Sequence, residues 1–266
     1  MIKTLPCGIE LKLVDNVYDV FLDMALTMLE SILKCHEEKR NCVMIVPVGP
    51  TEQYPILAEL VNRLNIPLHH VHFFNMDEYL ITPTEPIAPD HFMSFHARMN
   101  REFYDRVKPE LVMPESQRHF PEPGHEAEYD AMIEELGGVE LCLGGLGING
   151  HLAFNEPPEA AAPMTAEAFG ALGTRVLPIS RETRVANAIG DLNGAIDAMP
   201  THCVTIGISE ILSARKIRLG VFRDWHRAVV RQAAYGEVSA HFPVTLVQNH
   251  PDACIYVNAN AAIQPF

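Results

Sequence analysis

The chain has 266 residues, of which 48% are hydrophobic and 20% charged, and its formal net charge at pH 7 is −14. This composition is typical of a soluble globular protein, and the length predicts a single domain over residues 1–266 with a sizeable core. The acidic charge argues against nucleic acid or an anionic membrane surface as a partner, because both need a basic face. A small anionic substrate stays compatible, since a few local cations and backbone N–H groups can bind it.

Helical spacing of apolar residues predicts a helix over 17–36, and a short apolar run predicts a buried strand over 42–48. The same patterns predict further helices over 54–64, 91–107, 124–136 and 224–235, and further strands over 68–74, 139–143, 203–207, 217–222 and 253–257. Residues 81–90 hold three prolines and are expected to form a loop. Strands that alternate with helices predict an α/β fold, in which a mostly parallel sheet has helices on both faces.

Right-handed crossovers place all the strand-to-helix turns of such a sheet on one edge. We therefore expect the turns that carry Gly49, Asp77 and His151 to meet in one crevice. The stretch 157–173, rich in proline and alanine, is expected to be either a mobile lid over this crevice or a plain surface loop.

Cellular location is predicted from what the sequence lacks. There is no run of eighteen apolar residues and no signal peptide at the N-terminus, so we expect a cytoplasmic protein without a membrane-spanning helix. The six cysteines are scattered without a C-x-x-C pair, which favours reduced thiols over a disulfide framework or a zinc site. The oligomeric state stays open between a monomer and a homo-oligomer.

The most informative segment is 143–157, which reads L-G-G-L-G-I-N-G-H-L-A-F-N-E-P. An apolar strand ends in four glycines, and Asn149, His151 and Glu156 follow at once. Glycine lets a backbone adopt positive φ or approach a ligand closely, and α/β proteins place functional groups at the carboxyl edge of their sheets. A surface histidine and a plain phosphate-binding turn are the alternatives. The combination of residues favours a catalytic site.

Asp77 is a second candidate, because it directly follows an apolar strand. Partial burial there would raise the pKa of its carboxyl group toward the range of a general base. Glu78 should point the other way, since successive side chains at a strand end alternate. The alternative for Asp77 is a helix N-cap or turn carboxylate.

Four motifs together resemble the glucosamine-6-phosphate deaminase/isomerase family. Residues 74–79 (F-N-M-D-E-Y) match its FNMDEY signature, and residues 94–96 (S-F-H) are similar to its S-Y-H. Residues 147–157 (G-I-N-G-H-L-A-F-N-E-P) are similar to its G-x-(D/N)-G-H-I-A-F-N-E-P, and residues 183–187 match its T-R-V-A-N. The resemblance runs from about residue 43 to 257, nearly the whole chain.

The resemblance implies a Rossmann-like, doubly wound α/β fold and a sugar phosphate as the small-molecule partner. It implies isomerisation and deamination of a 2-amino-2-deoxyhexose 6-phosphate, such as glucosamine 6-phosphate to fructose 6-phosphate and ammonia, without a metal or redox cofactor. His151 would open the sugar ring, and Glu156 would orient His151. An imidazole whose pKa is near neutral suits such a proton transfer when a carboxylate holds it. Asn149 would position groups, because an amide cannot relay a proton. Asp77 would carry the proton from C2 to C1.

The phosphate loop departs from the family pattern. The family turn reads P-T-G-G-T-P, whereas residues 47–52 read P-V-G-P-T-E. Pro50 lacks a backbone N–H, and Glu52 adds negative charge where a dianion should bind. Gly49, Thr51 and the N-terminus of the following helix still favour a phosphate site.

Two arginines are expected at the phosphate by the same resemblance. Arg184 matches the family's phosphate-binding arginine, and Arg227 falls where the family has a lysine. The neighbouring His226 leaves this second assignment open by one residue, and a solvated helix charge is the alternative for Arg227. Whether the substrate is the gluco or galacto epimer, or a non-standard amino-sugar phosphate, also stays open.

The allosteric site of some family members is incomplete in this sequence. Glu159 and Ala160 stand where those members have a serine pair, and Leu177 stands where they have a lysine, although Arg175 is present. We expect no activation by an N-acetylated sugar phosphate.

Three other functions compete with the deaminase. A 6-phosphogluconolactonase shares the fold and a similar G-x-x-G-H turn, but its segment after the histidine is A-S-L-F-P, whereas residues 153–157 read A-F-N-E-P. A sugar-phosphate isomerase that releases no ammonia is the second. A non-catalytic sugar-phosphate sensor is the third, and the altered turn at 47–52 is what favours it.

Overall fold

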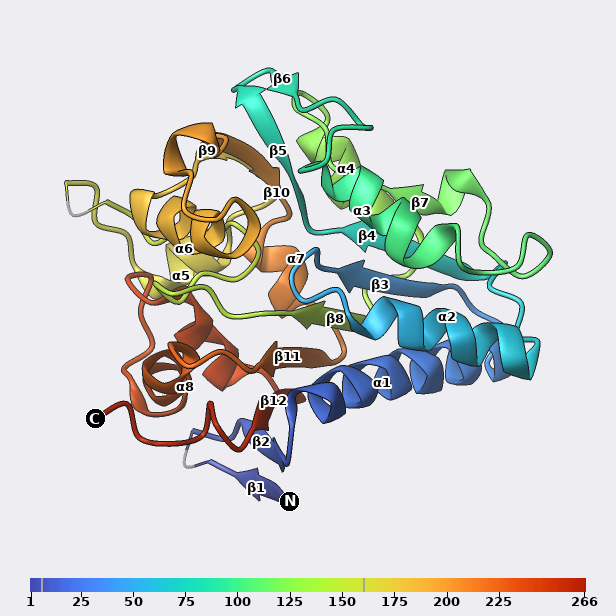
Figure 1. Ribbon diagram of the computed structural model, residues 1–266, viewed down its shortest axis with the longest axis horizontal. Coiled ribbons are helices and arrows are strands. Elements are labelled where there is room, and N and C mark those ends of the chain that lie inside the picture. Colours follow the sequence, from blue (N-terminus) through green and yellow to red (C-terminus); the bar gives the residue numbers. More distant parts are fainter. Residues whose placement is uncertain (6, 160) are drawn as a thin grey trace.

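A computed structural model describes residues 1–5, 7–159 and 161–266. Its main sheet has eight strands in the order β1-β2-β12-β11-β8-β3-β4-β7 (Figure 1). β1 and β2 pair antiparallel, and all other neighbours in this sheet are parallel. The strands are β1 Ile2–Thr4, β2 Glu10–Val14, β3 Cys42–Val46, β4 Val71–Asn75, β7 Arg118–His119, β8 Leu141–Gly144, β11 Ile217–Val221 and β12 Ala253–Asn258. The predicted α/β fold is confirmed.

Helices cover both faces of the main sheet, as predicted. Alternate residues of β3, β8 and β12 pack on opposite faces, because side chains of a strand alternate. One face packs against α1 Val17–Glu37, α2 Gln53–Leu64 and α3 Phe95–Met99, which a π-helical turn Asn100–Tyr104 continues. The other face packs against α4 Glu126–Glu135, α5 Ala166–Gly170, α7 Ile208–Leu212, α8 His226–Tyr235 and the 3-10 turn Pro243–Asn249.

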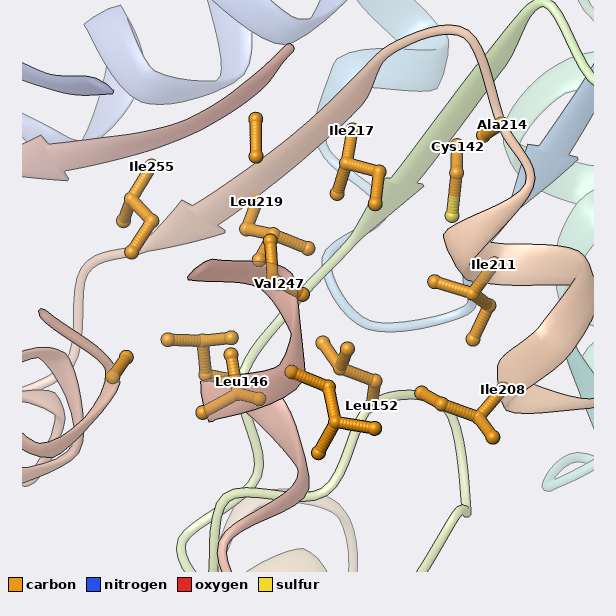
Figure 2. Close-up of a cluster of buried hydrophobic side chains, with 14 of the residues drawn as sticks. Cys142, Leu146, Leu152, Ile208, Ile211, Ala214, Ile217, Leu219, Val247 and Ile255 are labelled. Atoms are coloured by element: carbon orange, nitrogen blue, oxygen red, sulfur yellow. The ribbon is translucent and has the colours of Figure 1, made fainter. Parts of the chain in front are cut away.

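The second of these two cores reaches the segment that follows β8. Figure 2 shows Leu146 and Leu152 among the apolar side chains of β11, β12, α7 and the Pro243–Asn249 turn. Leu146 is 3% exposed and Leu152 is 1% exposed. The glycine-rich stretch between them is therefore held at both ends by the core.

A second, antiparallel sheet was not predicted. It has the order β6-β5-β10-β9, with β5 Asp77–Thr82, β6 Glu85–Pro86, β9 Arg175–Pro178 and β10 His202–Thr205. The chain continues from β4 through Met76 directly into β5, and the Met76 carbonyl accepts the N–H of Ile206, which follows β10. The strand predicted over 203–207 thus belongs to this second sheet, and Asp77 opens a strand instead of a turn.

Two further expectations are corrected by the structure. The helix predicted over 91–107 is shorter, because the Ser94 hydroxyl accepts the N–H of Ala97 and fixes the start of α3 at Phe95. The loop predicted over 81–90 contains β6, which pairs back on β5. α6 Arg181–Asp191 and the 3-10 turns Glu115–Gln117 and Ile196–Ala198 complete the described elements.

The stretch 157–173 contains α5, whose Phe169 is buried in the core. Ala160, one of the positions compared with the family's serine pair, lies outside the described residues. In the part of the chain that the structure describes, no helix combines the length and the apolar character needed to cross a bilayer.

Candidate active site

The carboxyl ends of β3, β8 and β11 and the start of β5 surround a cavity of about 190 Å³. From β3 the chain crosses through α2 to β4 on one side, while β8 lies on the other side of β3. Such a change of direction leaves a crevice at the carboxyl edge of an open α/β sheet, where ligands bind. Gly49, Thr51, Asp77 and His151 all line this cavity. Gly49, Asp77 and His151 therefore meet in one crevice, as expected, although Asp77 reaches it from the start of a strand and not from a turn.

The turn after β8 is shaped around His151. The imidazole packs against the backbone of Gly147, so closely that a Cβ at Gly147 would overlap the ring. Gly150 has φ +82°, and Phe242 fills the space where its side chain would lie. Glycine is therefore required at both positions, at the first for space and at the second for space and backbone conformation.

A chain of hydrogen bonds runs from Glu156 through Asn149 to His151. The Asn149 Nδ2 atom donates to Glu156 Oε2 at 2.6 Å, which turns the amide oxygen toward the ring. His151 Nδ1 lies 2.8 Å from Asn149 Oδ1 and 3.2 Å from the Thr183 hydroxyl. Because an amide oxygen can only accept, Nδ1 carries the proton and Nε2 is left as a base.

Glu156 is held as a carboxylate behind the histidine. Its Oε2 lies 3.7 Å from His151 Nδ1, and its Oε1 accepts the backbone N–H of Ser180. Burial by itself would raise the pKa of Glu156, but interaction with His151 and the hydrogen bond from Asn149 outweigh it and lower the pKa to about 2. Glu156 is thus charged at neutral pH and orients both neighbours.

Asp77 and Glu78 point to different places, as strand alternation predicts. The Glu78 carboxylate accepts hydrogen bonds from the Ser94 hydroxyl and from the N–H groups of Phe95 and His96, and so caps the start of α3. Asp77 faces the cavity, is 6% exposed and has no hydrogen bond to its carboxylate within the described residues. Burial, with a smaller effect of the Glu78 charge, raises the pKa of Asp77 well above its ordinary value.

The turn after β3 is a poor anion cradle. Gly49 has φ +127°, and its carbonyl oxygen would lie 3.0 Å from a Cβ at Gly145, so the turns after β3 and β8 touch. The N–H of Thr51 donates to the carboxylate of Glu52 at 3.0 Å. Because Pro50 has no N–H, the side chain of Glu52 occupies a donor that this turn could offer a phosphate.

Neither predicted phosphate-binding arginine lines the cavity. The guanidinium group of Arg184 donates to the carbonyl groups of Ile196 and Met199, each at 3.3 Å. The guanidinium group of Arg227 donates to the carbonyl and side-chain oxygens of Asn260, at 3.1 and 2.5 Å. Their role at a phosphate stays a prediction.

Other residues of the cavity were missed. Thr183 is next to Arg184 in the T-R-V-A-N motif, and it is Thr183 that meets His151. Arg98 of α3 and Arg223, which follows β11, supply the cavity's two arginines, and the sequence around them carries no signal for this role. His226 also lines the cavity, whereas its neighbour Arg227 does not. Among the described residues, no cluster of three or more metal-ligating side chains occurs.

The arrangement combines a buried carboxyl group of raised pKa, that of Asp77, with the His151 imidazole, whose Nε2 atom can accept a proton. Both line the same cavity, and a carboxylate fixes the imidazole from behind. Such a pair can carry out two proton transfers on one small polar substrate.

Comparisons with known proteins find relatives that act on sugar phosphates. No family model matches the chain. A glucosamine-6-phosphate deaminase from Cronobacter sakazakii is 31% identical over 220 residues, which are 81% of this chain and 77% of that protein. A monomeric glucosamine-6-phosphate deaminase of the NagB superfamily superposes with a TM-score of 0.80 at 25% identity, covering 95% of this chain and 98% of the other. A 6-phosphogluconolactonase from Leishmania guyanensis has a TM-score of 0.70 at 16% identity, covering 94% of this chain and 96% of the other, and shows the shared fold alone.

Proposed function

Because this chain belongs to the glucosamine-6-phosphate deaminase family, we propose that it converts a 2-amino-2-deoxyhexose 6-phosphate and water to the ketose 6-phosphate and ammonia. The observation that carries the proposal is the presence of Asp77 and His151 in the wall of one cavity. This reaction needs two proton-transfer groups: a carboxylate that moves a proton between two carbon atoms, and an imidazole that moves a proton between two oxygen atoms.

His151 opens the sugar ring. Its Nε2 atom takes the proton of the anomeric hydroxyl and returns a proton to the ring oxygen, so that the C1–O5 bond breaks and the open-chain aldehyde forms. The Asn149 amide oxygen supports this role, because it holds the ring proton on Nδ1. Glu156 keeps that amide oriented by accepting its N–H group.

Asp77 isomerises the open chain. Its carboxylate removes the proton from C2 to give an enolamine, and the same group delivers that proton to C1. The resulting imine at C2 adds water, and ammonia leaves. Burial supports this role, because a carboxylate of raised pKa is a stronger base and its conjugate acid keeps the proton between the two halves of the step.

Turnover with three substrates tests the proposal. The protein is supplied in turn with glucosamine 6-phosphate, galactosamine 6-phosphate and 6-phosphogluconolactone, while ammonia, ketose phosphate and lactone hydrolysis are followed. We expect ammonia and ketose phosphate in equal amounts from at least one amino sugar, and transfer of deuterium to C1 of the product when the substrate carries deuterium at C2. The Asp77→Asn variant should lose both signals.

Each competing function has a distinct outcome in this experiment. Lactone hydrolysis without ammonia from either amino sugar would contradict the proposal and favour a lactonase. Deuterium transfer without ammonia would favour a simple isomerase. No turnover together with a rise in melting temperature on adding an amino-sugar phosphate would favour a sensor. Full activity of the Asp77→Asn variant would exclude the role given to that residue.

A further inference from the structure

Two arginines of the cavity wall lie beside the last turn of α6. Arg98 Nη1 lies 3.9 Å from Asp191 Oδ1, and Arg223 Nη1 would lie 3.2 Å from a Cβ at Gly190. Because Gly190 and Asp191 are consecutive residues, the two guanidinium groups come close to the same point of α6. All four residues line the cavity.

Both arginines have donor capacity to spare. The Nε atom of Arg98 is buried and has no hydrogen-bond partner among the described residues. Within residues 1–5, 7–159 and 161–266, the Arg223 guanidinium group makes no hydrogen bond and has no carboxylate within 4 Å. Besides Gly190, the Phe222 ring lies near it, with its centroid 5.8 Å from the guanidinium carbon. A guanidinium group presents its N–H groups in a planar fork that fits two oxygens of one oxyanion.

The backbone of Arg223 is itself fixed. His226 Nδ1 accepts the N–H groups of Phe222 at 3.1 Å and of Arg223 at 2.9 Å, while its Nε2 lies 3.1 Å from the carbonyl oxygen of Leu146. Burial lowers the pKa of His226 to about 4, so the ring is neutral and can accept at neutral pH. This ring therefore ties the residues after β11 to the turn that carries His151.

Two acidic side chains also line the cavity. Glu52 lies in the turn after β3 and Asp77 at the start of β5, and the carboxylate of Glu52 already takes the N–H of Thr51. An anion would be repelled by these groups and would find few donors. The turn after β3 and the start of β5 thus disfavour an anion, whereas the two arginines that line the cavity lie beside the last turn of α6, where Asp191 is 3.9 Å from Arg98.

We propose that Arg98 and Arg223 bind the terminal phosphate of the substrate, and that Gly190 leaves the space that the Arg223 guanidinium group needs. This assignment rests on the proposed function for the identity of the anion, and it moves the anion away from the turn after β3. It also assigns no anion contact to Arg184 and Arg227, which do not line the cavity and whose guanidinium groups donate to protein oxygens, although the buried Nε atom of Arg184 has no partner among the described residues.

Inorganic phosphate is the probe for the first experiment, with acetate as a second arm. We expect phosphate to raise the melting temperature of the wild-type protein, and to raise it much less in Arg98→Gln and Arg223→Gln. Arg231→Gln is the control, because Arg231 is on α8 and does not line this cavity. With an amino-sugar phosphate as substrate, each of the two variants should raise KM about 10- to 100-fold, the range of a charged hydrogen bond, with a smaller change in kcat.

Gly190→Ala provides a variant that is expected to fold well. Alanine favours a helix over glycine, but the added methyl group would press on Arg223 Nη1. We expect an unchanged or higher melting temperature without ligand and a smaller rise on adding phosphate. Arg223 is exposed, so Arg223→Gln should also fold.

The outcomes separate this inference from the proposed function. If the Arg98→Gln/Arg223→Gln double variant keeps the full phosphate effect and KM, or if Arg184→Gln or Arg227→Gln alone abolishes them, the inference is overturned while the deaminase activity stands. If no amino sugar is turned over but the double variant loses the phosphate effect, the inference stands and the proposed function fails. Stabilisation by acetate and not by phosphate would overturn the assignment to a phosphate.

Discussion

Replacement of Glu156 by glutamine should remove a pH-dependent part of the stability of the protein. The carboxylate is 8% exposed, and its pKa in the folded chain is lowered from 4.5 to about 2. A carboxyl group of lowered pKa stabilises the folded state at pH values above 4.5, and this contribution is lost as the pH falls toward 2.

The size of the effect follows from the shift. The pKa of Glu156 moves by about 2.5 units, and at about 1.36 kcal/mol per unit this is about 3 kcal/mol at neutral pH. At pH 3 the linkage relation leaves about 1 kcal/mol of it, so about 2 kcal/mol disappears between pH 7 and pH 3. Glutamine cannot change charge in this range. The difference in unfolding free energy between wild type and Glu156→Gln should therefore shrink by about 2 kcal/mol over that interval.

Urea unfolding at a series of pH values measures this difference, with fluorescence of Trp225, the single tryptophan, as the signal. Glu167→Gln is the matched control, because Glu167 is exposed and its carboxylate makes no hydrogen bond in the described residues. The control should parallel wild type at every pH. A difference between wild type and Glu156→Gln that stays constant from pH 7 to pH 3 would show that Glu156 titrates alike in the folded and unfolded chain, and the reasoning would be wrong.

Three other substitutions test the site. Asp77→Asn should raise the melting temperature at pH 7, because a buried carboxyl group of raised pKa makes the folded protein less stable as the pH rises above 3.8, the pKa of the group in the unfolded chain. The same variant should lower kcat by about 10³-fold or more. A lower melting temperature would contradict the burial argument. Gly147→Ala should lower kcat by at least about 100-fold with secondary structure unchanged by circular dichroism, because the methyl group displaces the His151 ring; normal turnover would refute this packing. Asn149→Ala should reduce ring opening, measured as anomer exchange, whereas Asn149→Asp should retain it; unchanged exchange in Asn149→Ala would exclude the positioning role.

The sequence predicts the main sheet well for a physical reason. Its inner strands are buried on both faces, so they appear as apolar runs such as Cys42–Val46 and Ala253–Asn258. The missed strands lack that signal. β1 is exposed, and β9 is only half-buried, so neither stands out from a loop.

The residues around His151 could be predicted because they are neighbours in the chain as well as in space. The cavity residues that come from other parts of the chain could not be predicted in this way. A helix directs successive residues about 100° apart, so the T-R-V-A-N motif does not reveal that Thr183, and not Arg184, faces the histidine. Arg98 and Arg223 are 125 residues apart and come together only through α6, which no local pattern records.

The burial of Leu146 and Leu152 on either side of the glycine turn has a consequence for how the protein fails on heating. The Gly150 carbonyl also accepts the N–H of Val244, which is in the same core. The amide hydrogens in the buried part of the turn should therefore exchange with solvent only when the whole core opens. Activity and global structure would then disappear over the same narrow range of temperature.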